Sequence, residues 1–272
     1  MAKTTADDYS QYNKKTQIYR EAIETILKRE KSTLTDINQN PAEGVAFKRL
    51  ALAEDMLNLT SNYIILNSVS LSMLKAKNED ALNDGRKYLY TGLTYLEAVV
   101  GNFVDAPYSD YEDKLAALES LNAAQRYLLI RKMGLTIELL ENAYGDNSKW
   151  RWSFVDLEGR FAAAAKNILD LKAVVVNSDP TSPNYEATVY HLRTVKRLLT
   201  EAADRYREKY ELSTNEPEDF MQGIYFLGAL RRIHILLGER EDAEMIKKKQ
   251  EVWTAKLKTD SKKKADSEQK KR

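Results

Sequence analysis

The chain has 272 residues, of which 43% are hydrophobic and 31% are charged, and its formal net charge at pH 7 is +1. This balance is typical of a folded, soluble protein and argues against an intrinsically disordered one. The absence of cysteine excludes disulfides and thiolate chemistry, and two histidines leave few ways to build a histidine-based metal or catalytic site. Glycine and proline are scarce, at 10 and 5 residues, which argues against a turn-rich β fold.

The sequence shows neither a secretory signal nor a transmembrane span. No apolar region follows the first lysine, and no stretch approaches the 18 apolar residues that a membrane-crossing helix needs. We therefore expect a cytoplasmic protein.

Hydrophobic residues recur at helical spacing throughout the N-terminal part of the chain. The first predicted helix covers residues 7–31. Asn40-Pro41-Ala42-Glu43 then matches the cap, proline and glutamate of a helix start, and the second predicted helix runs from there to about residue 77. A third helix is predicted over residues 79–103.

The fourth predicted helix covers residues 109–145. A capping box of Ser109 and Glu112 opens it, and Gly145 ends it. We expect its buried face to be formed by five leucines: Leu118, Leu121, Leu128, Leu135 and Leu139.

The C-terminal half predicts four further helices, over residues 150–175, 183–206, 217–237 and 239–257. The first of them has the most regular spacing, because its apolar residues alternate steps of four and three. This series comprises Trp150, Phe154, Leu157, Phe161, Ala164, Ile168, Leu171 and Val175.

The predicted fold is all-α, with about eight mostly long antiparallel helices that form a bundle or a short helical-hairpin array. We expect a single domain over residues 1–257, with a possible sub-division near 178–184, and a flexible basic tail over 258–272. The last 17 residues hold eight basic and three acidic residues, so the rest of the chain is mildly acidic. Such a distribution is unlike that of a dedicated nucleic-acid-binding protein.

Two short segments carry a family resemblance. One is Tyr225-Phe226-Leu227-Gly228, followed by Gly238 and Ala243, and the other is Lys77-Asn78-Glu79-Asp80-Ala81-Leu82. They resemble the helical hairpins of tetratricopeptide proteins, in which a small residue near the start of the second helix allows close packing. The resemblance covers two hairpins and implies a helical scaffold used for protein binding.

No catalytic or metal-binding motif is found in the sequence. The residues three before His191 and His234 are Thr188 and Arg231, which excludes the Glu-x-x-His pairs of di-iron bundles. We expect His234 to be a core histidine with a satisfied ring nitrogen and His191 to be partly exposed near a helix start. We therefore predict no catalytic residue, no cofactor, no metal and no small-molecule substrate.

Basic residues allow two further interpretations. Arg126, Arg131 and Lys132, with Arg193, Lys196 and Arg197, could line a basic groove, although neighbouring acidic residues favour a solvated surface with intrahelical ion pairs. The Lys149-Trp150-Arg151-Trp152 segment could dock an anion, a membrane or a nucleic acid, but Trp150 fits the apolar series and favours packing in the core.

These observations predict a non-enzymatic scaffold or adaptor that binds other proteins, or a second copy of itself, through a helical surface. The alternative is an accessory protein that contacts nucleic acid or an anionic membrane through its basic tail. An enzyme that uses buried carboxylates is a third hypothesis, which a buried acidic pair would support. The candidate partner-binding residues are Trp152, Tyr88, Tyr95, Tyr225, Lys262, Lys263 and Lys264.

Overall fold

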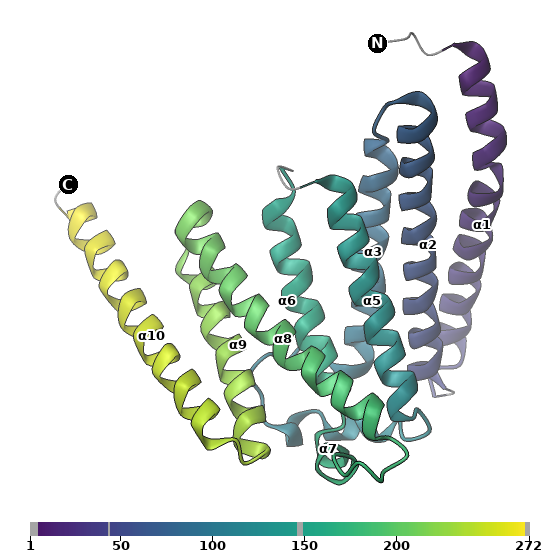
Figure 1. Cartoon of the computed structure of the whole chain (residues 1–272). Coiled ribbons are helices and arrows are strands. Elements are labelled where there is room, and N and C mark those ends of the chain that lie inside the picture. Colours follow the sequence, from purple (N-terminus) through teal and green to yellow (C-terminus); the bar gives the residue numbers. More distant parts are fainter. Residues whose placement is uncertain (1–4, 43, 146–148, 270–272) are drawn as a thin grey trace. The chain divides into compact units, whose positions relative to one another are not determined.

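The computed structural model describes residues 5–42, 44–145 and 149–269, and only the backbone of residues 265–269. Over these residues it contains ten α-helices and no β-strand, which confirms the all-α prediction and slightly exceeds the predicted number of helices (Figure 1). None of the described helices combines the length and apolar character needed to cross a membrane.

The chain divides into two compact units, where we predicted one domain with a possible sub-division near residues 178–184. Unit 1 consists of Met1–Gly101 and Lys114–Arg151, and unit 2 consists of Asn102–Asp113 and Trp152–Arg272. The segment 102–113, called the connector below, therefore packs with helices that follow it much later in the sequence. Helical periodicity does not reveal such a division, because it reports which face of a helix is covered but not by what.

Unit 1 is a bundle of long helices. It contains α1 (Ala6–Gln39), α2 (Val45–Leu74), α3 (Glu79–Val100) and α5 (Ala123–Tyr144). Helix α2 contacts α1 on one side and α3 on the other, and α5 packs against both α2 and α3 (Figure 1). One core cluster is formed by Ile23, Ile26, Met56, Leu59, Leu66 and Ala81.

The boundary between α1 and α2 differs from the prediction. Asn40 does not begin α2 but ends α1, because its backbone N–H donates to the carbonyl of Asp36 at 2.8 Å. Helix α2 begins after Gly44, whose φ of +57° is a left-handed conformation that glycine adopts without strain. Glu43 lies outside the described residues.

The predicted helix 109–145 is broken. A 3₁₀ turn (Tyr108–Asp110) and the short helix α4 (Glu112–Ala116) precede α5. Asn122, not Ser109, forms the capping box, with Gln125 as its partner. The buried Arg126 then donates to the carbonyls of Leu118 and Leu121, each at 2.9 Å, and so satisfies backbone acceptors at the break.

Unit 2 is built on α6 (Arg151–Ile168), α7 (Leu171–Asn177), α8 (Tyr185–Lys209), a π turn (Tyr210–Thr214), α9 (Pro217–Leu236) and α10 (Arg240–Gln269). Helix α9 contacts both α8 and α10. The glycine at position 159 allows α6 to approach the stacked rings of Tyr206 and Phe226, whose centroids are 5.6 Å apart. Pro217 occupies the first turn of α9, as the sequence indicates.

The regular apolar series predicted over residues 150–175 spans two helices. Asp170 ends the first segment by accepting hydrogen bonds from the backbone N–H groups of Lys172 and Ala173, and so starts α7. Phe154 to Leu171 are buried as predicted at each position of the series, Trp150 is partly buried, and Val175 is 59% exposed. Because α7 is a separate helix from α6, the buried face of α6 does not continue to Val175.

Helix α10 extends over most of the segment in which we predicted a flexible tail. Its backbone is helical to Gln269, and residues 270–272 lie outside the described part of the chain. Trp253 anchors it against Phe220, with ring centroids 5.4 Å apart. Lysine, alanine, glutamate and glutamine favour helix, which explains why the backbone stays helical in a segment poor in apolar residues.

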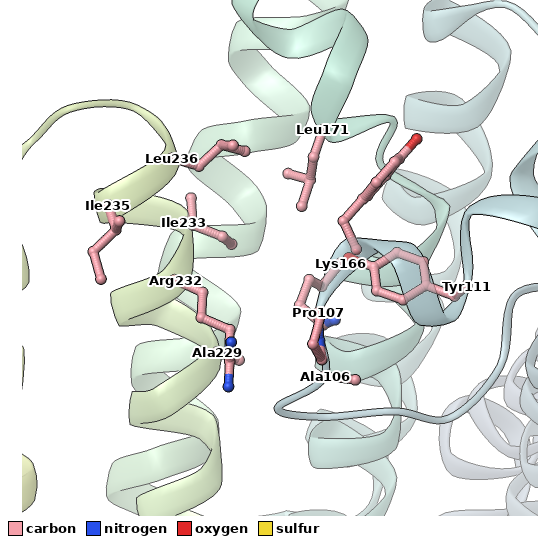
Figure 2. Close-up of a pocket in the computed structure, with 11 residues that line it drawn as sticks. Ala106, Pro107, Tyr111, Lys166, Leu171, Ala229, Arg232, Ile233, Ile235 and Leu236 are labelled. Carbon is pink, nitrogen blue, oxygen red and sulfur yellow. The ribbon is translucent and has the colours of Figure 1, made fainter.

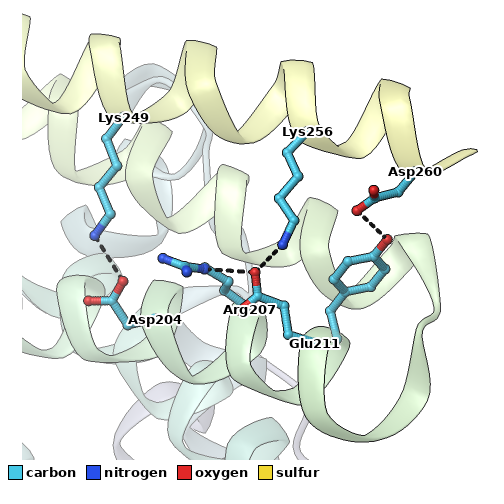
Figure 3. A network of polar contacts seen from close by, with 7 residues as sticks. Asp204, Arg207, Glu211, Lys249, Lys256 and Asp260 are labelled. Atoms are coloured by element: carbon cyan, nitrogen blue, oxygen red, sulfur yellow. Dashed lines mark hydrogen bonds and ion pairs between the residues drawn. The ribbon is translucent and has the colours of Figure 1, made fainter.

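A row of polar contacts joins α10 to α8 and the π turn (Figure 3). The Nζ of Lys249 lies 2.8 Å from Asp204, and the hydroxyl of Tyr210 donates to Asp260 at 3.1 Å. Between these contacts, Glu211 accepts hydrogen bonds from both Lys256 and Arg207. These contacts fix the register of α10 along unit 2.

Candidate functional site

A buried lysine lies near the end of α6 in unit 2. Lys166 follows four buried alanines, and it is only 3% exposed. Its ammonium lies 4.5 Å from the centre of the Tyr111 ring, which is a cation–π contact. Among the described residues, no carboxylate pairs with this ammonium and no hydrogen-bond acceptor reaches its Nζ. A buried charge without a counter-ion is costly, so this position calls for a physical explanation.

The electrostatic surroundings of Lys166 weaken its hold on the proton. Burial lowers the pKa of Lys166 from 10.5 to about 8, because the ammonium loses its hydration. The Asp105 carboxylate acts in the opposite direction, and the Arg232 guanidinium adds to the lowering. At pH 7 the side chain is therefore still protonated, while mildly alkaline conditions neutralise it.

The connector reaches this lysine because it is fixed to α9. The Nε of Arg232 donates to Asp105 at 2.5 Å, and Gly228 lies one turn earlier on the same helix. A Cβ at position 228 would collide with the Asp105 carboxylate, so the glycine provides the space in which that carboxylate lies. Gly228 and Arg232 thus form the seat of the connector on α9.

Two tyrosines of the connector complete one wall of the site. The hydroxyl of Tyr108 donates to Asp170 at 3.1 Å, and the rings of Tyr108 and Tyr111 meet edge to face, with centroids 5.4 Å apart. Burial raises the pKa of Tyr111 to about 12, and burial together with the charge of Asp170 raises the pKa of Tyr108. Both phenols are therefore neutral at physiological pH.

These elements line a cavity of about 280 Å³ that is open to solvent on one side (Figure 2). In the close-up, Ala229, Arg232, Ile233 and Leu236 project from α9, while Pro107, Lys166 and Tyr111 lie opposite them. The full lining is Ala106, Pro107, Tyr108, Tyr111, Lys166, Leu171, Ala229, Arg232, Ile233, Ile235 and Leu236. Apolar side chains with a few converging polar groups are typical of small-ligand sites.

The side chains that line this cavity are suited to binding a ligand and not to catalysing a reaction. Its lining contains two cationic side chains and two phenols but no histidine, serine, threonine or carboxylate. Asp105 lies beside it and is bound by Arg232, so the site carries one net positive charge when Lys166 is protonated. This charge, set among apolar walls, is suited to an anion with an apolar body.

Comparison with known proteins places the chain in a family. The model of the TP0443 family matches residues 8–261. The chain belongs to the TP0443 family. No curated protein and no solved structure matches it. The matched region of this TP0443-family chain includes every residue that lines the cavity.

The structure places Tyr88 and Tyr95, two of the candidate partner-binding residues, against the core cluster of unit 1. Tyr88 stacks on Tyr63 with ring centroids 5.7 Å apart, and the Tyr95 hydroxyl donates to Glu30 at 2.6 Å. Burial raises the pKa of both phenols, and a hydrogen bond to Glu30 adds to this effect for Tyr95. Both therefore contribute to packing between helices.

The other candidate partner-binding residues belong to unit 2. Tyr225 is 45% exposed on α9, and Trp152 is half-buried in the first turn of α6. Lys262, Lys263 and Lys264 are exposed on α10. Nothing in these positions identifies a partner.

The histidines differ from each other in how well they match the prediction. His191 is 2% exposed, and its Nε2 lies 3.0 Å from the carbonyl oxygen of Ala165, so the prediction of a partly exposed residue is wrong. His234 is a largely buried histidine whose Nδ1 lies 2.6 Å from Glu239. A helix position cannot reveal the burial of His191, because it depends on the approach of α6.

His234, Glu239 and Asp242 converge closely enough to be a candidate cation site. Lys196, however, donates to both carboxylate oxygens of Glu239, at 2.8 and 2.5 Å. Burial acts to raise the pKa of Glu239, but the hydrogen bonds from Lys196 and His234 outweigh it and hold that pKa below 4.5. The lysine ammonium thus already supplies the positive charge that a metal would bring.

The basic residues proposed to line a groove are mostly engaged in other contacts. Arg126 is buried, Lys132 pairs with Glu54 at 2.8 Å, and Arg197 pairs with Glu201 at 2.8 Å. In the aromatic-basic segment, the Arg86 guanidinium lies 3.8 Å from the centre of the Trp150 ring. This contact supports the packing interpretation of Trp150.

Sequence reasoning did not find the cavity. The available signal was Lys166 itself, a single charged residue after Phe161-Ala162-Ala163-Ala164-Ala165 and before Ile168. A lysine at the end of an apolar segment usually extends to solvent. Only the folding of the connector over α6 shows that this one does not.

Proposed function

We propose that the protein is a non-enzymatic protein–protein interaction scaffold whose binding surface is the exposed face of α5. The observation that carries the proposal is the exposure of Leu128, Leu135 and Leu139, which are 48%, 49% and 54% exposed. The three residues, called the α5 stripe below, are spaced by seven and four positions and therefore lie in one line along the helix. This is the spacing by which helices dock on one another.

The α5 stripe lies opposite the face by which α5 packs in unit 1. Helical geometry places it about half a turn from the buried residues of the same helix. These are Arg126, Leu129, Ile130, Met133, Thr136, Ile137, Leu140 and Tyr144. We predicted Leu128, Leu135 and Leu139 to be buried within the chain, and the structure corrects this. The packing of α5 leaves about half of each of these leucines exposed, which supports a role in binding.

The size and charge of the surface indicate the kind of partner. Three half-exposed leucines cover much less than the ~800 Å² per partner that a stable interface buries, so a permanent dimer on this stripe alone is not expected. Arg131 and Glu138 are exposed at its edge, on either side of Leu135. We infer a transient partner: an amphipathic helix of another protein, with an acidic residue against Arg131 and a basic one against Glu138.

Site-specific photo-crosslinking tests this function. The full chain carries benzoylphenylalanine in place of Leu135, or in place of the 68% exposed Leu212 as the matched control, and cross-linked peptides are identified by mass spectrometry. We expect position 135 to select the apolar face of a helix in a partner protein, and Arg131→Glu to abolish the product. A synthetic peptide of that helix should then bind the purified chain roughly tenfold more weakly after Leu135→Ser.

Two outcomes would contradict the proposal. Cross-links from position 135 to α5 of a second copy would replace the partner helix with self-association. Products no more specific than those at Leu212 would remove the α5 stripe as a binding surface. Misfolding does not confuse the result, because substitution of half-exposed leucines should change the free energy of unfolding by no more than about 0.5 kcal/mol.

A second candidate function rests on the three consecutive lysines of α10. Lys262, Lys263 and Lys264 are exposed, and attraction of each to an anionic surface is worth about 1 kcal/mol at low salt. Deletion of the whole segment from residue 258 is a poor test, because it removes Asp260, which binds Tyr210. Replacement of the three lysines by glutamine should instead abolish salt-sensitive binding to anionic vesicles or single-stranded DNA. If the variant bound the vesicles or the DNA as tightly as the unchanged chain does, the three lysines would be excluded as a binding site.

A further inference from the structure

We propose that the cavity around Lys166 is a binding site for a small organic carboxylate, with the carboxylate held by Lys166 and Arg232 and an apolar body held between the connector and α9. The site lies wholly within unit 2. It is independent of the α5 stripe and adds a ligand that the proposed scaffold function does not include.

The head-group position follows from the two cations. Lys166 is buried, its Nζ faces the Tyr111 ring, and no carboxylate among the described residues forms a direct ion pair with it, although Asp105 acts on it from farther away. Arg232 uses its Nε for Asp105, and its side chain is 53% exposed, so its terminal nitrogens can reach a ligand from the solvent side. A carboxylate between these groups would supply the missing counter-charge, and charge-assisted hydrogen bonds are the stronger ones.

The body of the ligand is defined by the remaining walls. Pro107, Leu171, Ala229, Ile233 and Leu236 offer apolar surface, and the Tyr111 ring closes the side next to Lys166 (Figure 2). The volume of about 280 Å³ lies at the lower end of the range for ligand sites, which fits a body of a few carbon atoms. A long lipid chain would not be accommodated.

The charge of the site selects a carboxylate over other head groups. A cation would be repelled by Lys166 and Arg232, and a neutral group would leave the ammonium unpaired. A phosphate dianion needs more hydrogen-bond donors than this site offers. The backbone N–H groups of Lys172 and Ala173 at the start of α7 are not free to bind it, because they already donate to Asp170. One net positive charge therefore matches one carboxylate.

Carboxylate binding should also change the protonation of Lys166. Without ligand, burial lowers the pKa of this ammonium to about 8, and a bound anion would raise it again. At pH 8.5 the unliganded site is largely neutral, so binding should be accompanied by uptake of a fraction of a proton. This coupling distinguishes an anion beside Lys166 from an anion bound elsewhere on the surface.

The experiment is isothermal titration calorimetry of the full chain with hexanoate, and with hexan-1-ol, hexylammonium and hexyl phosphate as comparison probes. We expect hexanoate to bind at least tenfold more tightly than each of the other three. Titrations at pH 8.5 in two carboxylate-free buffers of different ionisation enthalpy should show proton uptake with hexanoate. Lys166→Met keeps the length of the side chain but removes the charge, and should weaken hexanoate binding at least tenfold and abolish the proton uptake.

The matched control is Lys248→Met, because Lys248 is an exposed lysine of unit 2 on α10 and does not line the cavity. It should bind hexanoate as the unchanged chain does. Unchanged binding by Lys166→Met, equal binding of hexan-1-ol, or no binding of hexanoate at millimolar concentration would each overturn the proposal. Loss of folding cannot imitate the expected result, because removal of an unpaired buried charge should stabilise unit 2, and thermal unfolding of each variant verifies this.

Discussion

The Nζ of Lys166 lies 4.5 Å from the centre of the Tyr111 ring, in a part of unit 2 where no described carboxylate forms a direct ion pair with it. The aromatic ring offers a weaker substitute for an anion, since a cation–π contact returns only part of the lost hydration. This pair joins α6 to the connector. It therefore makes the stability of unit 2 dependent on pH.

The first prediction concerns this dependence. The pKa of Lys166 is about 8 in the folded chain and 10.5 as its ordinary value, so between these pH values the unfolded chain holds a proton that the folded chain has lost. The free energy of unfolding should therefore rise with pH across this window, by roughly 3 kcal/mol. Lys166→Met should remove this rise and stabilise the protein at pH 7.

Urea denaturation from pH 7 to 10.5 measures the free energy of unfolding of the unchanged chain and of Lys166→Met. The difference between the two isolates Lys166, because the other titrating groups contribute equally to both. Lys248→Met serves as the control and should keep the slope of the unchanged chain. A parallel pH dependence in the chains with and without Lys166 would show that this lysine is hydrated in solution.

The second prediction concerns Gly228. Gly228→Ala places a Cβ into the space occupied by the Asp105 carboxylate, so the connector must move away from α9. We expect a loss of about 1–2 kcal/mol, because overpacking outweighs the gain in helix propensity. The measurement is a double-mutant cycle by urea denaturation with Asp105→Ala.

In the Asp105→Ala background, Gly228→Ala should cost much less or even stabilise α9, since the obstructing carboxylate is gone. If the two substitutions are additive, Asp105 does not lie against Gly228. Hexanoate binding should weaken in parallel with the loss of the connector seat.

The third prediction concerns the polar row of Figure 3. The pKa of Glu211 is lowered, chiefly by its hydrogen bond from Lys256 and further by Arg207, against the effect of burial. A carboxylate of lowered pKa stabilises the fold at pH values above its ordinary value of 4.5, and this contribution is lost as the pH falls through the folded value. Glu211→Gln should therefore cost about 0.5–1 kcal/mol at pH 7 and flatten the acid side of the stability profile.

Hydrogen exchange of the α10 amides reports this locally, and protection near Lys256 should fall first. The control is Glu218→Gln, because Glu218 is exposed in the first turn of α9. Equal losses from the two substitutions would show that the contacts of Glu211 contribute nothing beyond surface charge.

The fourth prediction concerns the break before α5. Arg126→Met leaves the carbonyls of Leu118 and Leu121 without the guanidinium donors that now reach them. The Leu118 carbonyl still accepts the backbone N–H of Leu121 at 2.9 Å, whereas the Leu121 carbonyl loses its guanidinium donor, so we expect a loss of about 1–2 kcal/mol. Arg131→Met, one turn later on the exposed face, should change the free energy of unfolding by less than about 0.5 kcal/mol. Similar values for the two variants in thermal unfolding would contradict the role assigned to Arg126.

The sequence alone was sufficient for the fold class and for several helix starts, such as those of α3, α6 and α9. The periodic burial of Phe154, Leu157 and Phe161 follows from their spacing, since one face of a helix must be covered. Pro217 marks the start of α9 because proline lacks the N–H that an interior helix position must donate. Features of this kind depend on residues that are close together in the sequence, so the sequence is enough to predict them.

Other features depended on contacts between residues distant in the chain, and only the tertiary structure decided them. The stripe of Leu128, Leu135 and Leu139 has the same periodicity as a buried one, yet about half of each side chain is exposed. The burial of His191 and Lys166 results from the approach of α6 to α8 and of the connector to α6. Spacing defines which side chains share a face, whereas the burial of a charge or a leucine is set by whichever segment packs against that face, and this information is non-local.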